Sequence, residues 1–172
     1  VPKNFVQALS DPVWGEPART EFHRIVVETK SAIAVPYEMA IDNIKKGADV
    51  LRFLPIYEEK TKEGVTGVKQ VRLVLDGSQQ KNHGATYAAT PSREEFLVMC
   101  HVAAHFDWDL VHMDEKRAFL GAEKQHTATT YGRFSGDKRF YQIMNAVYGQ
   151  KDAMRDYTDK RGRKLEEKGF TR

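Results

Sequence analysis

The spacing of apolar residues predicts short helices and strands in an irregular order along the chain. From residues 12 to 34 the apolar positions recur at helical spacing, and Pro36 closes this predicted helix. Its apolar face is formed by Phe22, Ile25, Val26 and Ile33. Residues 50–57 and 68–75 have the composition and alternation of strands, and Val71, Leu73 and Leu75 share one face of the second strand. A turn containing two glycines joins them, so we expect a hairpin.

The second half of the chain begins with a helix signal. Ser92 and Glu95 have the spacing of a capping box, and the predicted helix, which ends near residues 105–106, carries an apolar stripe of Phe96, Met99, Val102 and Ala103. A strand is predicted over 108–114, followed by a turn to Leu120 and by weaker strand candidates at 127–131 and 139–143. The last predicted helix covers 151–168, with Gly169 at its end. Helices and strands without regular alternation predict the α+β class.

Composition adds few constraints. A chain of 172 residues fits one domain with a core of its own. No apolar run is long enough to cross a membrane, and no signal-peptide pattern is present, so we expect no membrane insertion. Cys100 is the single cysteine, which excludes an internal disulfide. We therefore expect a soluble protein of a reducing, intracellular compartment, without assigning the compartment.

The net charge of +3 is concentrated at the C-terminal end. Residues 151–172 hold eight Lys or Arg and five Asp or Glu, whereas the rest of the chain is neutral. Such a helix can contact phosphates of RNA or DNA, and it can equally be a solvated surface helix with mixed charges. The candidate nucleic-acid-binding residues are Lys160, Arg161, Arg163 and Lys164.

Four segments, in order, match motifs of one family. The first two are Val71-Arg72-Leu73-Val74 with Gly77, similar to K-A-R-L-V-A-K-G, and residues 86–91, similar to D-Y-x-E-T-F-S-P. The other two are residues 114–120, similar to D-V-K-x-A-F-L, and residues 147–155, similar to L-Y-G-L-K-Q-A-P-R. On these segments, and along nearly its whole length, the chain resembles the reverse transcriptase domain of copia-type LTR retrotransposons.

The resemblance implies a right-hand polymerase-like fold with fingers and an incomplete palm. Residues of about 1–105 would form mainly the fingers, and about 106–172 a partial palm ending in the basic helix. In this family two magnesium ions support attack of a primer hydroxyl on a nucleotide phosphate. By position, Asp114 would be the catalytic metal ligand. The other carried-over roles concern the substrate: Arg72 on the triphosphate, Phe119 as the steric gate, Gly149 beside the nascent base pair and Lys151 near template or nucleotide.

The chain also departs from the family pattern. Gln70 replaces a lysine, Glu115 replaces a small apolar residue, and the fourth motif is altered at Gln150, Asp152 and Met154. The family's Y-x-D-D motif does not follow, and one aspartate cannot hold two magnesium ions. We therefore expect Asp114 to be vestigial and the domain to be a domesticated relic, a structural or nucleic-acid-contacting subunit of a larger assembly with protein partners.

Besides a free nucleic-acid-binding module that acts through the basic C-terminal helix, two alternatives stay open. The chain can be an excerpt of an active RNA-directed DNA polymerase from a retrotransposon polyprotein, and only then is magnesium expected. The other alternative is zinc, because His101 and His105 lie four residues apart on a predicted helix and His112 follows on the next strand. No H-E-x-x-H motif and no second cysteine support that site, so surface histidines are the favoured interpretation.

Overall fold

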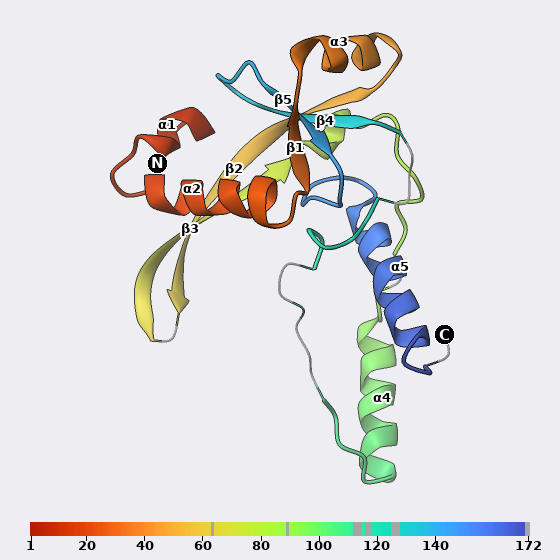
Figure 1. The fold of residues 1–172 in the computed structure, drawn as a ribbon. Helices are drawn as coiled ribbons and strands as arrows, with labels where there is room; N and C mark the ends of the chain where they lie inside the picture. Colours follow the sequence, from red (N-terminus) through yellow and green to blue (C-terminus); the bar gives the residue numbers. More distant parts are fainter. Residues whose placement is uncertain (63, 89, 112–114, 116–117, 125–127, 171–172) are drawn as a thin grey trace.

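The computed structural model describes residues 1–62, 64–88, 90–111, 115, 118–124 and 128–170, and it has the α+β class predicted from the sequence (Figure 1). The helical elements are α1 (Phe5–Leu9), α2 (Gly15–His23), the π-helical turn η1 (Arg24–Glu28), α3 (Tyr37–Lys45), the 3-10 turn η2 (Gly77–Gln79), α4 (Arg93–His105) and α5 (Ala153–Glu166). The strands are β1 (Ala32–Val35), β2 (Asp49–Lys62), β3 (Val65–Leu75), β4 (Thr130–Phe134) and β5 (Phe140–Ile143).

The described strands form one mixed sheet in the order β1-β5-β4-β2-β3 (Figure 1). β2 and β3 form the predicted hairpin, with Phe53 opposite Leu75, and its tip extends beyond the rest of the sheet. β2 pairs with β4 in parallel, whereas β4 with β5 and β5 with β1 are antiparallel. Strands from both sides of residue 105 therefore share one sheet. The division into fingers and palm stays a prediction.

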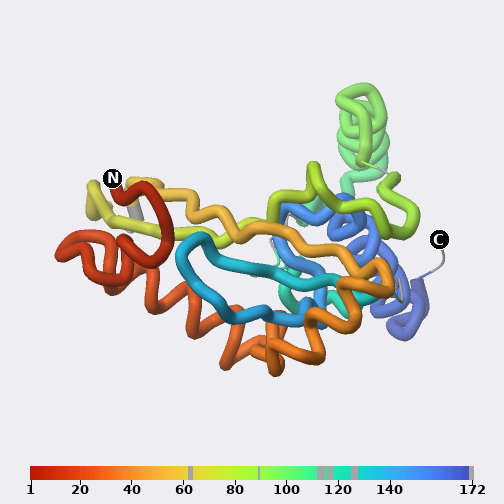
Figure 2. The backbone as a smooth tube through the Cα atoms, turned by 90° about the horizontal axis from the view of Figure 1, so that it is seen from above, coloured from red at the N-terminus to blue at the C-terminus, as the bar shows by residue number. Residues whose placement is uncertain are grey.

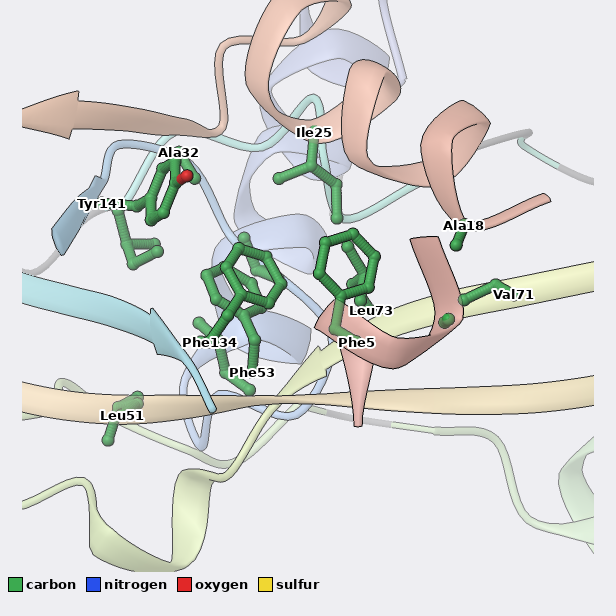
Figure 3. Packing of buried hydrophobic residues seen from close by; sticks show 14 of the residues in the cluster. Phe5, Ala18, Ile25, Ala32, Leu51, Phe53, Val71, Leu73, Phe134 and Tyr141 are labelled. Atoms are coloured by element: carbon green, nitrogen blue, oxygen red, sulfur yellow. The ribbon is translucent and has the colours of Figure 1, made fainter. Parts of the chain in front are cut away.

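Two apolar clusters cover the two faces of the sheet. On one face, Phe53 and Phe134 stack with ring centroids 4.5 Å apart, and Phe5 of α1 stacks on Phe134 at the same distance (Figure 3). On the other, Tyr131 and Phe140 pack beneath α3. β1, β2, β4 and β5 contribute residues to both clusters from opposite faces, as strand geometry requires, whereas β3 contributes to the first cluster alone. The prediction that Val71, Leu73 and Leu75 share one face of β3 is confirmed, and all three side chains are buried.

The helix predicted over 12–34 is wrong in its second half. α2 ends at His23, η1 adds one wider turn, and Ile33 lies in β1, where its side chain is 41% exposed. Lys30 adopts a left-handed conformation (φ 50°), which ends the helical path and lets the chain enter the sheet. Pro36 does not close a helix but precedes the first residue of α3, a helix that the apolar pattern did not predict.

The capping box at Ser92 and both C-terminal helices are confirmed. The Glu95 N–H donates to the Ser92 hydroxyl (3.1 Å), and the Ser92 N–H donates to the Glu95 carboxylate (2.6 Å). The apolar stripe of α4 is exposed except at Ala103. The strand predicted after α4 is wrong in its described part, because residues 108–111 are exposed and irregular. α4 projects away from the sheet in both views of the backbone (Figures 1 and 2).

The described part of the chain contains no helix with the length and apolar character needed to span a membrane.

Candidate functional site

The segment leading into α5 is where the family-like segments of the chain meet. From the end of β3, the Leu75 N–H donates to the Tyr148 carbonyl (2.7 Å). From the second segment, the Tyr87 carbonyl accepts a hydrogen bond from the Arg155 guanidinium (3.4 Å). From the third, the Phe119 ring lies 4.9 Å from the Tyr148 ring, edge to face. Four segments separated in sequence are therefore neighbours in space, as a shared site requires.

Gly149 holds this junction together by close backbone contact. Its φ is +90°, and a Cβ placed on it would lie well inside 3.0 Å of the Leu75 carbonyl oxygen. Gly77, just after β3, faces it, and a Cβ there would overlap the Gly149 carbonyl oxygen. Both positions thus require glycine for packing within the chain. The role of Gly149 beside a nascent base pair stays a prediction.

Gln80 is the centre of the polar contacts at the same junction. Its side chain is 1% exposed, its amide donates to the Asp152 carboxylate (3.2 Å), and its amide oxygen accepts the Lys151 N–H (2.9 Å). Its main-chain carbonyl accepts a hydrogen bond from the Lys151 ammonium (2.7 Å). The lysine predicted to lie near template or nucleotide is therefore bound by the chain's own backbone.

A half-buried lysine lies among the carboxylates next to Gln80. The Lys124 ammonium donates to the Thr130 hydroxyl (3.0 Å). Burial lowers the pKa of Lys124, and the negative charges of Asp152, Asp156 and Asp49 oppose this shift. Asp152 and Asp156 are themselves 1% and 2% exposed. One cation thus offsets part of a buried negative charge, which ties β4 to the start of α5 and to β2.

Asp49 organises the loop that carries Gln80. It is the first residue of β2, it is buried, and one of its carboxylate oxygens accepts the N–H groups of Lys81 (3.0 Å) and Asn82 (2.7 Å). The Gly84 N–H reaches Asp152 in the same way (3.4 Å). Buried carboxylates that accept main-chain N–H groups fix a loop in one conformation. The cluster is therefore built to position backbone.

Phe119, the predicted steric gate, lies in a small aromatic group. Besides Tyr148, the Tyr157 ring contacts it at 5.7 Å. The Tyr157 hydroxyl donates to the Glu115 carboxylate (3.2 Å), and Lys160 lies 4.0 Å from the same carboxylate. Burial, assisted by the charge of Glu115, raises the pKa of the Tyr157 hydroxyl. Glu115, which departs from the family pattern, thus has a polar partner and a cationic one on α5.

Arg72, the predicted triphosphate contact, is engaged on the hairpin. Its guanidinium lies 3.4 Å from the Glu58 carboxylate of β2. Its charge also acts on Glu21, a carboxylate of α2 that is 3% exposed. The described structure therefore brings Phe119, Gly149 and Lys151 together at the start of α5, and it pairs Arg72 on the hairpin instead.

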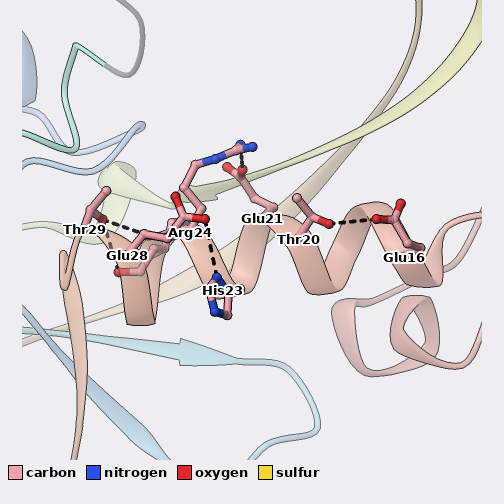
Figure 4. A network of polar contacts seen from close by, with 8 residues as sticks. Glu16, Thr20, Glu21, His23, Arg24, Glu28 and Thr29 are labelled. Carbon is pink, nitrogen blue, oxygen red and sulfur yellow. Dashed lines mark hydrogen bonds and ion pairs between the residues drawn. The ribbon is translucent and has the colours of Figure 1, made fainter.

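Glu21 belongs to a polar network along α2 and η1 (Figure 4). It forms an ion pair with Arg24, and the Leu73 N–H of β3 donates to its carboxylate. Burial raises the pKa of Glu21, and these two partners oppose the shift. An open cavity of about 340 Å³ lies beside it, lined also by Thr20 and Lys69. These contacts give Glu21 a role in joining α2 to β3.

Neither metal hypothesis is met by the side chains that the structure describes. Asp114, the predicted magnesium ligand, and His112, a member of the zinc hypothesis, lie outside the described residues. Among the described residues, no three His, Cys, Asp or Glu side chains form a group that could hold a metal ion. These residues therefore do not fit a two-magnesium centre. Metal binding through Asp114 stays a prediction.

The predicted nucleic-acid-binding residues lie on the second half of α5: Lys160, Arg161, Arg163 and Lys164. The last two are exposed, and so is Arg161 at the start of this half. The acidic residues earlier in the same segment face other groups, because Asp152 and Asp156 are buried and Asp159 forms an ion pair with Arg155 (2.8 Å). The basic excess of the segment is therefore displayed on the outer end of α5.

The sequence motifs did not identify the residues grouped around Gln80, apart from Asp152. Asp49, Gln80 and Lys124 are isolated polar residues without a motif, and each lies far from its partners along the chain. No local signal identifies them. The one available indication was Asp152 itself, a carboxylate where the family has an amide.

Comparison of the chain with protein-family models, with curated proteins and with solved structures gave no match.

Proposed function

We propose that the chain is a reverse-transcriptase-like domain of the copia type that works as a structural, nucleic-acid-contacting part of a larger assembly and does not synthesise DNA. Two observations support the resemblance: the order of the four motif-like segments, and their meeting at the start of α5. An α+β chain with a five-stranded mixed sheet is compatible with the expected fingers and palm.

One observation supports a structural role: the residues that would face a nucleotide bind other parts of the same chain. The Lys151 ammonium is held by the Gln80 carbonyl, and Asp152 is buried beneath the Gln80 amide. The Phe119 ring packs between two tyrosines. A nucleotide has to displace these contacts, and a hydrogen bond to a charged group contributes about 1.5–3 kcal/mol. Substrate binding would therefore compete with the packing of the domain.

A direct test is primer extension by the purified chain on an RNA template, with deoxynucleotides and magnesium. We expect no extension above that of the Asp114→Asn variant. Extension that this substitution abolishes would instead establish the alternative, an excerpt of an active RNA-directed DNA polymerase.

A second test separates packing from substrate binding at Lys151. Lys151→Ala removes the bond to the Gln80 carbonyl, so we expect a lower midpoint of thermal unfolding. We also expect no saturable binding of a fluorescent deoxynucleotide, either by the unsubstituted chain or by Lys151→Ala. Lys164→Ala, which changes an exposed lysine on the same helix, is the matched control for the unfolding measurement. Tight nucleotide binding that is abolished in Lys151→Ala alone would contradict the proposal.

The outward-facing basic residues of α5 support the nucleic-acid-contacting part of the role. Binding to RNA or DNA should weaken as salt rises, because cations are released from the phosphates. Replacing the four basic residues with alanine should make the slope of log affinity against log salt shallower by about 0.7–0.9 for each phosphate that the protein no longer neutralises. Lys45→Ala with Lys46→Ala, exposed at the end of α3, is the control. Binding that ignores salt or survives the fourfold change would remove this part of the proposal.

A further inference from the structure

A cavity of about 300 Å³ opens between α1, α2 and the turn that joins β4 to β5. Most of its lining is apolar and consists of Phe5, Val6, Leu9 and Phe22. Asp137 and Arg139 of the turn form the polar part of the lining. Small-molecule sites are typically concave and largely apolar, with a few polar groups that orient the ligand. None of the described residues that line this cavity belongs to the junction at the start of α5, so the cavity is a separate candidate site.

The walls of the cavity are fixed by contacts within the chain. The Phe5 ring is buried and stacks on Phe134 with ring centroids 4.5 Å apart (Figure 3). The Arg19 guanidinium donates to the Leu9 carbonyl (2.8 Å), which joins the end of α1 to α2. The Asp137 N–H donates to the Phe134 carbonyl (3.1 Å) and closes the turn between β4 and β5. The walls are thus positioned without a ligand, and a pre-organised site loses less free energy to ordering when a ligand binds.

The Arg139 guanidinium is held on one side and free on another. Its Nε and Nη2 atoms donate to the Asp137 carboxylate at 3.0 Å and 2.8 Å, and it lies 5.7 Å from the centre of the Tyr141 ring. The Arg139 side chain is nevertheless 65% exposed, whereas that of Asp137 is 15% exposed. Its Nη1 atom has no hydrogen-bond partner within the described part of the chain. Because a guanidinium can grip a second carboxylate through its free N–H groups, Arg139 is a positioned anchor for an anion.

The charges around the cavity also favour an anion beside Arg139. Among the described residues that line the cavity, Asp137 alone is acidic, and α1 carries no charged residue. The Asp137 oxygens already accept the Arg139 guanidinium and the Arg139 main-chain N–H (3.0 Å). Lys138 adds an exposed cation on the same turn. The acidic residues of α2 and of the segment before it do not line this cavity: Asp11, Glu16 and Glu21. The turn therefore offers two cations beside one occupied carboxylate.

The volume of the cavity sets the size of its ligand. A water molecule takes up about 30 Å³ of the liquid, so the cavity accommodates on the order of ten non-hydrogen atoms. We propose that this cavity binds a small organic acid with an apolar body, such as a medium-chain acyl carboxylate. The carboxylate pairs with the free side of Arg139, and the apolar body lies against α1 and Phe22. This site goes beyond the proposed function and does not depend on it.

Titration of the purified chain with octanoate, followed by the amide signals in two-dimensional NMR spectra, tests the proposal. We expect saturable binding with a dissociation constant on the order of 10–100 µM, with the largest shifts in α1 and in the turn between β4 and β5. Octanamide has the same size without the charge and should bind about ten-fold more weakly or worse. Absence of saturable octanoate binding at about 1 mM, or equal affinity for the acid and the amide, would overturn the proposal.

A charge variant with a matched control tests the anchor. Arg139→Gln removes the guanidinium and should weaken octanoate binding by about ten-fold or more, while octanamide binding changes far less. The retained octanamide binding also shows that the variant is folded. Lys138→Gln removes the same charge from the neighbouring residue, which does not line the cavity, and should weaken octanoate binding by about three-fold at most. Equal losses in the two variants would show general charge attraction and would overturn the assigned role of Arg139.

A filling variant tests the position of the apolar body. Val6 is 42% exposed, so Val6→Trp can place its larger side chain in the cavity without displacing the buried core. We expect it to abolish binding of both octanoate and octanamide while the midpoint of thermal unfolding stays close to that of the unsubstituted chain. Val27→Trp changes a similarly exposed residue on η1, which does not line the cavity, and should leave both affinities unchanged. Undiminished octanoate binding by a folded Val6→Trp variant would place the ligand elsewhere and refute the proposal.

Discussion

Replacing Gly149 with alanine tests whether this glycine serves packing or substrate. Its φ of +90° costs an L-residue about 1–2 kcal/mol. In addition, the new Cβ would overlap the Leu75 carbonyl oxygen, which is backbone in a paired strand and cannot rotate away. Overpacking of this kind costs about 1–3 kcal/mol. We therefore expect Gly149→Ala to lower the free energy of unfolding by about 2–5 kcal/mol.

The chain offers a matched control at Gly47, whose φ is +100° and whose Cβ would meet no atom within 4 Å. Gly47→Ala has the backbone penalty without the overlap, so we expect a decrease of about 1–2 kcal/mol. Urea unfolding followed by circular dichroism measures both variants. Equal decreases would show that Gly149 is not packed against Leu75. A ligand-contacting role would then be the better explanation for this glycine.

Three other perturbations test the buried groups and the helix cap. Asp152→Ala leaves the Gln80 amide without its carboxylate and should lower the free energy of unfolding by about 3–5 kcal/mol. Asp159→Ala breaks a surface ion pair and should lower it by at most about 1 kcal/mol in the same urea titration. The raised pKa of Glu21 gives native stability that is fully present below the unfolded pKa and is lost as pH rises through the folded pKa. Relative to Glu21→Gln, the native chain should therefore lose stability as pH rises above about 4.5, and parallel pH profiles would refute the assignment. Ser92→Ala removes the hydroxyl that caps the helix and should cost about 1 kcal/mol, with faster amide hydrogen exchange in the first turn of α4; unchanged exchange there would contradict the cap.

Local signals explain why some elements were predictable. The β2–β3 hairpin combines two apolar runs and a glycine turn, and α4 and α5 have a capping box and a terminal glycine, so neighbouring residues suffice. β1 is different, because Ala32–Val35 has no strand pattern of its own and is ordered by pairing with β5. The exposure of the α4 stripe was not predictable for a related reason: apolar spacing predicts a helix face, but it does not say whether that face is covered within the same chain.

Only the part of the candidate site that lies in sequence motifs was predictable. The segments containing Phe119, Gly149 and Lys151 do meet, but their partners inside the chain do not follow from any motif. Gln80 and Lys124 act through contacts with residues distant in sequence, and a single sequence does not display such contacts. The same holds for the ion pair of Arg72 with Glu58, which depends on the register of the hairpin.

The pairing of β1 with β5 has a consequence for how the chain is made. Ala32 pairs with Ile143, so this strand, once synthesised, finds its neighbour only after α3, the hairpin and α4 have followed. Until then β1 lacks the strand with which it pairs, and contacts of such high sequence separation form slowly. We therefore expect the growing chain to expose an unpaired strand, a feature that favours aggregation, until β5 has been made.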